Sequence, residues 1–468
     1  MRIYLDIQKG YKYLFFTIFI LLFSVASSTV MSEEMDKDSR IRELERKLEA
    51  VSQEVNKLKE QQGVSNKISE IEDKLTVLVE EIENIKSSSV TAERKYEQKH
   101  GHAEGASQVY HVGKGFSVGG YGELFISQIE EDDDNTVDTQ RVILYVGHKF
   151  TDNIIFNSEI EFEHGTTSSN QDGRSGSASV EFASIDFLIS ESFNIRGGLL
   201  LAPFGIVNEQ HEPTTFFGVL RPDIETQIIP TTWRESGAGI FGEINDVIPG
   251  TLSYRAYLMN SFDSRGFRAS NNRSLRVKGN RARFNDIAFV SRLEYDPIPG
   301  VKFGGSWFIG QTGQNESVDG QTIGGLFQMY EGDVDINWRG FEGRALFVYT
   351  FLDDAELINA QNGLVGDDSV GEEQFGWYVQ GAYNIMSLAD VHPYFQYLAP
   401  FVRYEQYDTQ KDVPAGFLRN PANDRDVLTF GLNYKPIPNV VVKVDYQVRD
   451  DEADSSNNQI NLGLGYVF

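Results

Sequence analysis

Few residues of this chain are arranged in a way that could carry out catalysis. Residues 115–119 read Gly-Phe-Ser-Val-Gly and match the Gly-x-Ser-x-Gly pattern of serine hydrolases. That chemistry needs a sharp turn from a strand into a helix to present the serine. The residues that follow alternate as in a strand, so we interpret the match as coincidence. The chain contains no cysteine, which excludes thiol catalysis, disulfides and cysteine-ligated metals. We therefore expect no enzyme, no catalytic residue and no cofactor.

Residue types that bind metal ions are present, but in unfavourable surroundings. His100 and His102 form a His-x-His pair that can hold a metal ion, yet they lie in a stretch rich in glycine, alanine and glutamine. The acidic run 130–134 could bind divalent cations near lipopolysaccharide, although a solvated loop tip explains it more simply. The sequence thus predicts no metal site, and it places the two histidines in a solvated linker.

Positive charge is concentrated in one stretch of an acidic chain, whose net charge is −27. Seven basic residues occur without an acidic one between them: Arg265, Arg268, Arg273, Arg276, Lys278, Arg281 and Arg283. Such a cluster could attract anions to the mouth of a pore, bind the phosphates of lipopolysaccharide, or cross a neighbouring acidic loop. The overall acidity argues against nucleic acid as a partner, because phosphates attract lysine and arginine.

The N-terminus indicates an exported protein. Arg2, Lys9 and Lys12 precede the apolar run 14–26, and small residues follow it. This order is typical of a secretory signal peptide, here residues 1–28. The alternative, a membrane anchor, would need about 20 apolar residues to span a bilayer, and the run is shorter.

Residues 36–87 are predicted to form an α-helical coiled coil in the periplasm. Apolar residues recur at spacings of three and four in two blocks, Ile41, Leu44, Leu48, Val51, Val55, Leu58 and Ile68, Ile71, Leu75, Leu78, Ile82, Ile85. Isoleucine at both core positions of the second block favours three strands, hence a trimeric stalk. A helical hairpin that reverses at Gly63 is the alternative. Residues 91–112 then form a polar linker.

In residues 113–468 apolar and polar residues alternate with a period of two, and we predict that this part is an all-β transmembrane barrel. In 442–449 valines and a tyrosine alternate with Lys443, Asp445, Gln447 and Arg449, the pattern of strands with a lipid face and a lumen face. Short turns at 151–153, 297–300 and 436–439 alternate with long polar loops. About 16 antiparallel strands fit the length, and 18 fit almost as well. A soluble sandwich or propeller would leave the charged inward faces unexplained.

Two groups of residues are candidates for the pore. Residues 203–235 are too irregular for a strand and too apolar for an exposed loop, so we expect a loop folded into the lumen; a poorly patterned strand pair is the alternative. The second group consists of charged residues on the inward face of predicted strands and of arginines of the basic cluster. The predicted pore-lining or solute-steering residues are Arg221, Arg234, Arg273, Arg276, Arg281, Arg283, Arg292, Arg403, Lys443, Glu159, Glu161 and Glu163.

Three motifs carry a resemblance to a known family. Gly119-Gly-Tyr-Gly-Glu-Leu-Phe, Phe156-Asn-Ser-Glu-Ile-Glu-Phe-Glu-His and Pro230-Thr-Thr-Trp-Arg-Glu-Ser-Gly-Ala-Gly resemble the phosphate-selective porin O/P family. The resemblance implies trimeric, 16-stranded diffusion pores of the bacterial outer membrane with a loop inside the lumen. The terminal residues 466–468 resemble the signal that the barrel-assembly machinery recognises. The family's arginine ladder and lysine cluster have no residue-by-residue match here.

The sequence therefore predicts an outer-membrane porin for passive diffusion of small hydrophilic solutes or ions, including anions such as phosphate. Its expected partners are membrane lipid and lipopolysaccharide, two further copies of itself in a homotrimer, and the barrel-assembly machinery acting on the strand that ends at Phe468. The alternative is a structural anchor, whose coiled coil tethers or spaces the envelope while the barrel only holds it in the membrane.

Overall fold

The computed structural model describes residues 98–131, 135–245, 249–388 and 397–468. The predicted signal peptide (1–28) and coiled coil (36–87) lie outside the described residues. Within these ranges, none of the helices combines the length and the apolar composition needed to cross a membrane.

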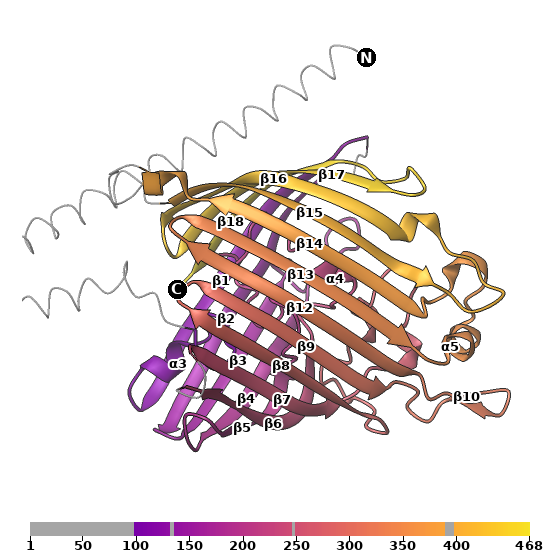
Figure 1. The fold of residues 1–468 in the computed structure, drawn as a ribbon, viewed down its shortest axis with the longest axis horizontal. Coiled ribbons are helices and arrows are strands. Elements are labelled where there is room, and N and C mark those ends of the chain that lie inside the picture. Colours follow the sequence, from indigo (N-terminus) through magenta and orange to yellow (C-terminus); the bar gives the residue numbers. More distant parts are fainter. Residues whose placement is uncertain (1–97, 132–134, 246–248, 389–396) are drawn as a thin grey trace, which may run out of the picture. The chain divides into compact units, whose positions relative to one another are not determined.

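Sixteen strands of the described residues close into one antiparallel barrel (Figure 1). In chain order they are β1 (Gly115–Ile129), β2 (Thr136–Thr151), β3 (Ile154–Glu163), β4 (Ala178–Leu188), β5 (Asn194–Leu201), β6 (Arg234–Ile244), β7 (Thr251–Asn260), β8 (Ile287–Ile298), β9 (Val301–Gln311), β12 (Leu326–Trp338), β13 (Phe341–Leu352), β14 (Glu373–Tyr383), β15 (Tyr397–Asp412), β16 (Asp424–Ile437), β17 (Val440–Asp451) and β18 (Gln459–Val467). Strands adjacent in the chain pair with each other, and β1 pairs with β18 to close the ring. This confirms the predicted all-β barrel and selects 16 strands over 18.

Alternation along each strand explains why these residues form a barrel. In β17 the side chains of Lys443, Asp445 and Gln447 are buried, while those between them are partly exposed. Large apolar side chains are exposed on strand after strand, among them Phe303, Trp307, Phe347, Val402 and Phe430. The predicted parity of this strand is therefore correct: polar residues point inward and apolar residues point outward, as in a membrane-spanning barrel.

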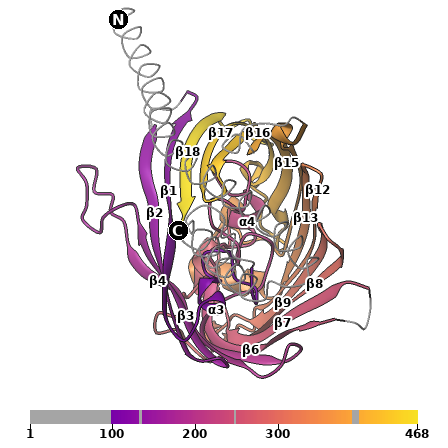
Figure 2. The ribbon, with the colours of Figure 1, turned by 90° about the vertical axis from the view of Figure 1, so that its left-hand side faces the viewer.

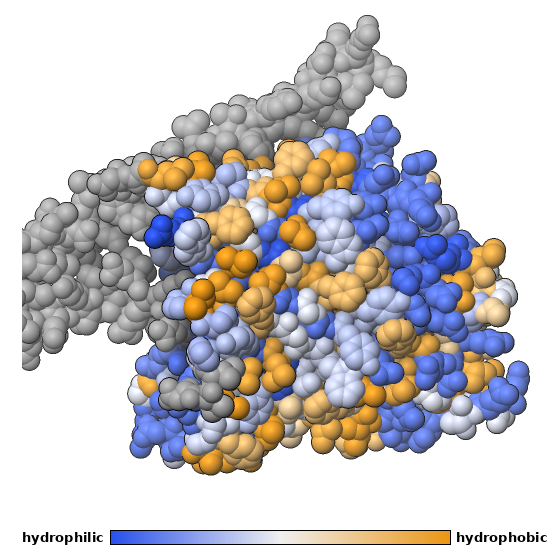
Figure 3. Space-filling view, viewed as in Figure 1, coloured by the Kyte–Doolittle hydropathy of each residue, from blue (hydrophilic) through white to orange (hydrophobic). Residues whose placement is uncertain are grey.

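Tight and long connections alternate around the barrel. Two residues join β8 to β9 (299–300) and β12 to β13 (339–340), whereas 202–233 and 261–286 join β5 to β6 and β7 to β8. The long connections also carry α5 (Ala355–Asn362) and the hairpin of β10 (Ser317–Val318) and β11 (Gln321–Thr322). Hydrophilic atoms gather at the end that bears α5 and β10, and apolar atoms are frequent over the strands (Figure 3). The predicted arrangement of short turns opposite long loops is confirmed.

Residues 98–112 differ from the prediction of a solvated linker. Ala103, Ala106 and Val109 are buried, as is His102, and the segment ends in the short helix α3 (Gln108–His111). Asn157 of β3 donates to the Ala106 carbonyl oxygen at 2.8 Å. The glycines and alanines that look like linker composition have small side chains, which lets the backbone of this segment pack closely against the barrel wall.

The interior also contains an apolar region that strand alternation did not predict. The ring centroids of Trp233, Phe262 and Phe308 lie within 5.1 Å of one another, and Phe327 lies beside them. These rings come from two long connections and two strands of the wall. Both connections are therefore attached to the inside of the barrel by hydrophobic packing as well as by polar contacts.

Candidate functional site: a charged lumen with an inserted loop

The connection 202–233, which we call the lumen loop, folds into the barrel. Most of its residues are buried, and the end-on view shows its helix α4 (Ile224–Gln227) inside the ring of strands (Figure 2). Asn208 joins the two ends of the loop. Its Nδ2 donates to the carbonyl oxygens of Ala202 (2.7 Å) and Trp233 (3.0 Å), and its Oδ1 accepts from the Trp233 amide (2.7 Å). The prediction of an inserted loop is confirmed, and the alternative strand pair is wrong.

Charged side chains of the opposite wall hold the tip of the lumen loop. Lys443 Nζ donates to the Phe216 carbonyl oxygen and Arg403 Nη1 to that of Phe217, each at 2.9 Å. Asp445 accepts from the Val219 amide at 2.5 Å. Arg403 and Lys443 thus face inward as predicted, but donors that we expected to meet solutes are used to bind the loop backbone.

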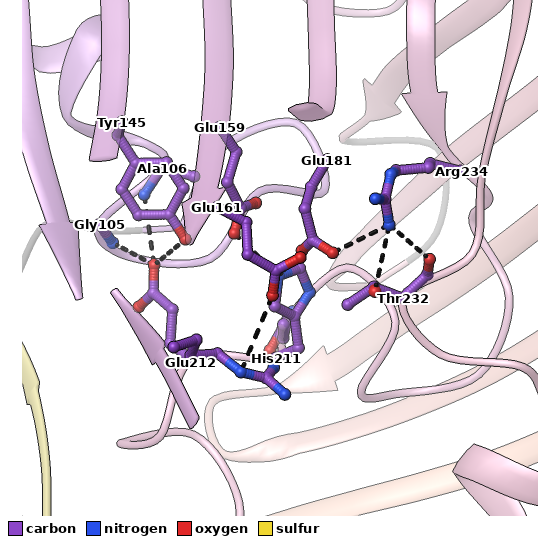
Figure 4. A network of polar contacts seen from close by, with 12 residues as sticks. Gly105, Ala106, Tyr145, Glu159, Glu161, Glu181, His211, Glu212, Thr232 and Arg234 are labelled. Carbon is purple, nitrogen blue, oxygen red and sulfur yellow. Dashed lines mark hydrogen bonds and ion pairs between the residues drawn. The ribbon is translucent and has the colours of Figure 1, made fainter. Parts of the chain in front are cut away.

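A second polar cluster joins the lumen loop to β3 and β4 (Figure 4). His211 Nε2 lies 3.2 Å from Glu159 Oε1 and 3.2 Å from Glu181 Oε2. Arg234 Nη1 donates to Glu181 Oε1 at 2.9 Å. Burial lowers the pKa of His211, but the two carboxylates outweigh it and raise the pKa well above its ordinary value. Among the predicted residues, Glu159 and Arg234 therefore belong to one cluster.

The neighbouring Glu212 connects the lumen loop to residues 98–112. Its Oε1 accepts from the Gly105 amide (2.8 Å), the Ala106 amide (3.3 Å) and the Tyr145 hydroxyl (3.1 Å). Burial raises the pKa of Glu212 to about 7, with Glu104 adding to the shift. The two inserted segments and the wall thus form one connected network.

A cavity of about 650 Å³ lies in the lumen against the lumen loop. Residues of the lumen loop, of strands β1, β2 and β16–β18 and of two long connections line it, and we call it the loop-side cavity. Its charged lining consists of five arginines and three carboxylates, namely Arg141, Arg221, Arg273, Arg425, Arg449, Glu123, Asp223 and Asp451. Arg141 pairs with Glu123 at 3.3 Å, and Arg449 pairs with Asp223. The formal balance of 5 − 3 leaves the cavity positive within an acidic protein.

The predicted arginine cluster divides into two groups. Arg273 and Arg276 donate to the Thr231 carbonyl oxygen at 2.9 and 3.0 Å, and Arg273 lines the loop-side cavity. Their partners are neutral, and burial beside Arg273 and Arg234 lowers the pKa of Arg276. Arg265 and Arg283 instead form ion pairs with Asp263 and Glu316. Of the second group, only Arg283 crosses to an acidic residue of a neighbouring connection, because Asp263 lies in the same connection as Arg265. The first group keeps its positive charge beside the cavity.

The remaining predicted residues lie apart from this cavity or at its border. Arg221 lines it and donates to the His211 carbonyl oxygen at 3.3 Å. Arg292 is buried among Glu294, Glu331 and Asp333. Three members remain. Glu161 lies beside Glu181 (Figure 4) and is 4.0 Å from Arg141. Glu163 accepts from the Ser177 hydroxyl, and Arg281 is exposed.

Several interior charges were missed by sequence reasoning. Arg196 of β5 forms two hydrogen bonds with Asp186 of β4, at 2.7 and 2.8 Å. Glu225 of the lumen loop accepts from the Val207 amide (2.6 Å) and the Tyr378 hydroxyl (2.7 Å). Asp186 and Arg196 each stand on an alternating strand and could have been found by parity. Glu225 could not, because nothing local distinguishes it.

Comparison with known proteins supports the barrel and identifies a relative. A family model described as the β-domain of inverse autotransporters matches residues 382–468. An outer-membrane porin, the Salmonella typhi OmpF complex with daunomycin, has a TM-score of 0.51 at 14% identity, covering 75% of this chain and 97% of that one. OmpTdeltaL8 of Vibrio cholerae has 0.47 at 12% identity, covering 75% and 99%.

The first of these two structures shows a shared porin-type barrel fold. The resemblance to phosphate-selective porins, by contrast, remains a prediction, because the matching family model is a different one. An uncharacterized protein of Aquifex aeolicus (strain VF5) is 38% identical over 380 residues, which span 79% of this chain and 84% of that protein. The chain therefore belongs to the same family as this Aquifex aeolicus protein.

Proposed function

We propose that the protein is an outer-membrane porin that lets small hydrophilic solutes and ions diffuse passively. The observation that carries this proposal is the loop-side cavity: a space of about 650 Å³ inside a closed barrel, bounded by the lumen loop and lined by charged side chains. Rings of charge and a narrowed lumen are the means by which channels select ions. The apolar exterior supports placement in a membrane.

The cavity lining favours anions, among them phosphate-like solutes. Arg221, Arg273 and Arg425 line it with hydrogen bonds to neutral oxygens. Guanidinium groups offer paired donors that match phosphate and carboxylate oxygens. Screening limits the field of these charges to about 10 Å at 0.1 M salt, so only charges at the conduction path affect selectivity.

Reversal potentials test this proposal. The purified full chain is inserted into planar bilayers in a KCl gradient, beside the double variant Arg273→Gln/Arg276→Gln. We expect open channels, and a shift of the reversal potential toward cations in the variant, largest at low salt. Phosphate should reduce the chloride current of the wild type more than that of the variant.

A matched control comes from the same connection. Arg265→Gln/Arg283→Gln removes the same charge, but from residues paired with Asp263 and Glu316. This control should leave the reversal potential unchanged. Equal shifts in both double variants would mean that the field of the whole connection acts. No shift in either would place the arginines outside the conduction path.

One observation favours the second candidate, a structural anchor. The lumen loop and residues 98–112 are both buried inside the barrel and bind each other through Glu212. An anchor needs no open path, so it predicts barrels that insert and remain closed. A conducting wild type would argue against the anchor. The porin proposal also includes three partners: two further copies of the chain in a homotrimer, the barrel-assembly machinery and lipopolysaccharide.

A further inference from the structure

Glu159, Glu181 and His211 form a buried cluster in which three possible metal-ligand atoms converge. The three side chains are almost completely buried, with exposed fractions of 0%, 0% and 2%. Each offers one ligand atom, and these atoms lie within 4.8 Å of one another. They come from three different elements, namely β3, β4 and the lumen loop (Figure 4).

The orientation of the histidine decides what its second nitrogen can do. His211 Nδ1 lies 2.8 Å from the Asn208 carbonyl oxygen. A carbonyl oxygen only accepts, so Nδ1 carries the hydrogen, and Nε2 faces the two carboxylates. A backbone carbonyl that fixes the tautomer in this way is the usual support of a metal-binding histidine.

A proton alone satisfies this arrangement incompletely. A protonated Nε2 has one hydrogen to donate, and Glu159 Oε1 accepts it. Glu159 Oε2, Glu181 Oε2 and the Tyr121 hydroxyl remain buried without a hydrogen-bond partner among the described residues. Each such group costs free energy when it is kept from water.

A divalent metal ion accounts for the distances from His211 to the two carboxylates. Zinc binds imidazole nitrogen and carboxylate oxygen at about 2.0–2.2 Å, so two ligands of a tetrahedral ion lie about 3.3 Å apart. Both distances from Nε2 are 3.2 Å. Three protein ligands leave the fourth position of such an ion to water.

Local backbone structure also places the second carboxylate at this point. The register of β3 and β4 shifts after Glu159, which pairs with Phe182 while Ile160 pairs with Val180. Glu181 is therefore the extra residue of a β-bulge, and it and Phe182 are both buried. Bulges redirect a side chain and are frequent beside functional sites.

We propose that Glu159, Glu181 and His211 form a binding site for a divalent transition-metal ion, with zinc as the best match. The ion joins the lumen loop to the β3–β4 wall, at a point that neither Arg403 nor Lys443 secures. Arg234, on the other oxygen of Glu181, holds that carboxylate in position. The inference does not depend on the proposed function, because a closed barrel could bind the ion equally well.

The zinc content of the purified protein tests the proposed site directly. The full chain is purified without a histidine tag, stripped with a chelator, equilibrated with zinc and analysed by elemental mass spectrometry. We expect one zinc per chain that resists gel filtration, and at least a 100-fold loss of zinc affinity in Glu181→Gln and His211→Asn. Glu212→Gln is the matched control: it removes a buried carboxylate beside His211 without removing a ligand, and it should keep the zinc.

Cobalt gives a second measurement that needs no variant. Co²⁺ in a tetrahedral site with nitrogen and oxygen ligands absorbs visible light much more strongly than hydrated Co²⁺, so the wild type alone reports the geometry. Equal zinc content in wild type and Glu181→Gln, or a wild type whose cobalt spectrum is that of the hydrated ion, would overturn the site and leave a protonated histidine between two carboxylates. Bilayer conductance takes no part in either measurement, so failure here is distinguishable from failure of the porin proposal.

Discussion

Side-chain parity on single strands determines which substitutions the barrel tolerates. Val444 of β17 lies between the inward-facing Lys443 and Asp445 and points outward. We predict that Val444→Arg destabilises the folded barrel by about 2–4 kcal/mol, if the residue lies near the membrane midplane, because a charge then faces lipid. The midpoint of urea unfolding, followed by heat-modifiable gel mobility, measures the effect.

Gln447→Ala on the same strand serves as the control. Its side chain is buried inside the barrel, so its loss should change the unfolding midpoint little. Equal destabilisation by the two substitutions would show that the assigned faces of β17 are wrong.

The buried ion pair of Arg403 and Glu405 in β15 leads to a second prediction. Arg403 donates from Nε to Glu405 at 2.7 Å and from Nη1 to the Phe217 carbonyl oxygen. Removing one partner leaves the other charge buried, which typically costs about 3–5 kcal/mol. Arg403→Met should therefore lower the unfolding midpoint strongly.

The double variant Arg403→Met/Glu405→Leu tests the cause of that loss. It removes the stranded carboxylate and should recover most of the stability, because replacing a buried pair with apolar groups is often neutral. A double variant no more stable than Arg403→Met would indicate that contact with the lumen loop, and not the buried charge, is what matters.

At the scale of elements, residues 98–112 provide a pH-dependent contact. Burial, and then Arg196, lowers the pKa of His100 to about 4, and burial lowers the pKa of His102 as well. A released segment has an ordinary histidine pKa of about 6.5. The contribution of the two histidines to docking is therefore complete above pH 6.5 and is lost as the pH falls from 6.5 toward 4, since the released form binds protons first. Glu212, whose pKa burial raises to about 7, contributes with the opposite sign, so variants of the histidines are needed to separate the two effects.

The absence of cysteine from the chain makes this prediction measurable. Ala106 is buried in the docked segment, so Ala106→Cys should react with a pyridyl disulfide faster as the pH falls, relative to Ser168→Cys on an exposed connection. In a His100→Gln/His102→Gln background this relative increase should disappear. A constant ratio in the wild-type background would contradict the assignment.

The faces of strands and the positions of tight turns could be predicted from the sequence, whereas contacts between distant elements could not. Strand alternation and turn positions follow from local chemistry, so the inward face of Lys443 and the tight turn at 299–300 were predictable. The partners of Lys443 were not, because the Phe216 carbonyl oxygen reaches it through the fold alone. The joining of Glu181 to His211 depends on a bulge in β4 and on the inserted loop. The loop could be predicted from its irregular, apolar sequence, but the bulge and the meeting of the two side chains could not.

For the whole molecule, the predicted coiled coil leads to a test of assembly. Residues 36–87 lie outside the described structure, and their spacing predicts a trimeric stalk. Replacing Ile71, Leu75, Leu78 and Ile82 with asparagine should weaken the trimer in cross-linking experiments, because polar groups buried at a helical seam cost stability. Each barrel should still show heat-modifiable mobility, since the closed ring of strands is made within residues 115–467. An unchanged trimer would mean that the barrels associate on their own.

The seam between β1 and β18 determines when the ring of strands can form. Tyr121 pairs with Val467, and Gly120 and Phe468 exchange two backbone hydrogen bonds of 2.9 and 2.8 Å. The first strand must therefore wait, unpaired on one side, until β18 has been made. Every shortened product of an interrupted translation keeps two open sheet edges, which invite aggregation. A protease that recognises open edges would thus distinguish closed barrels from chains that lack β18 without reading any sequence.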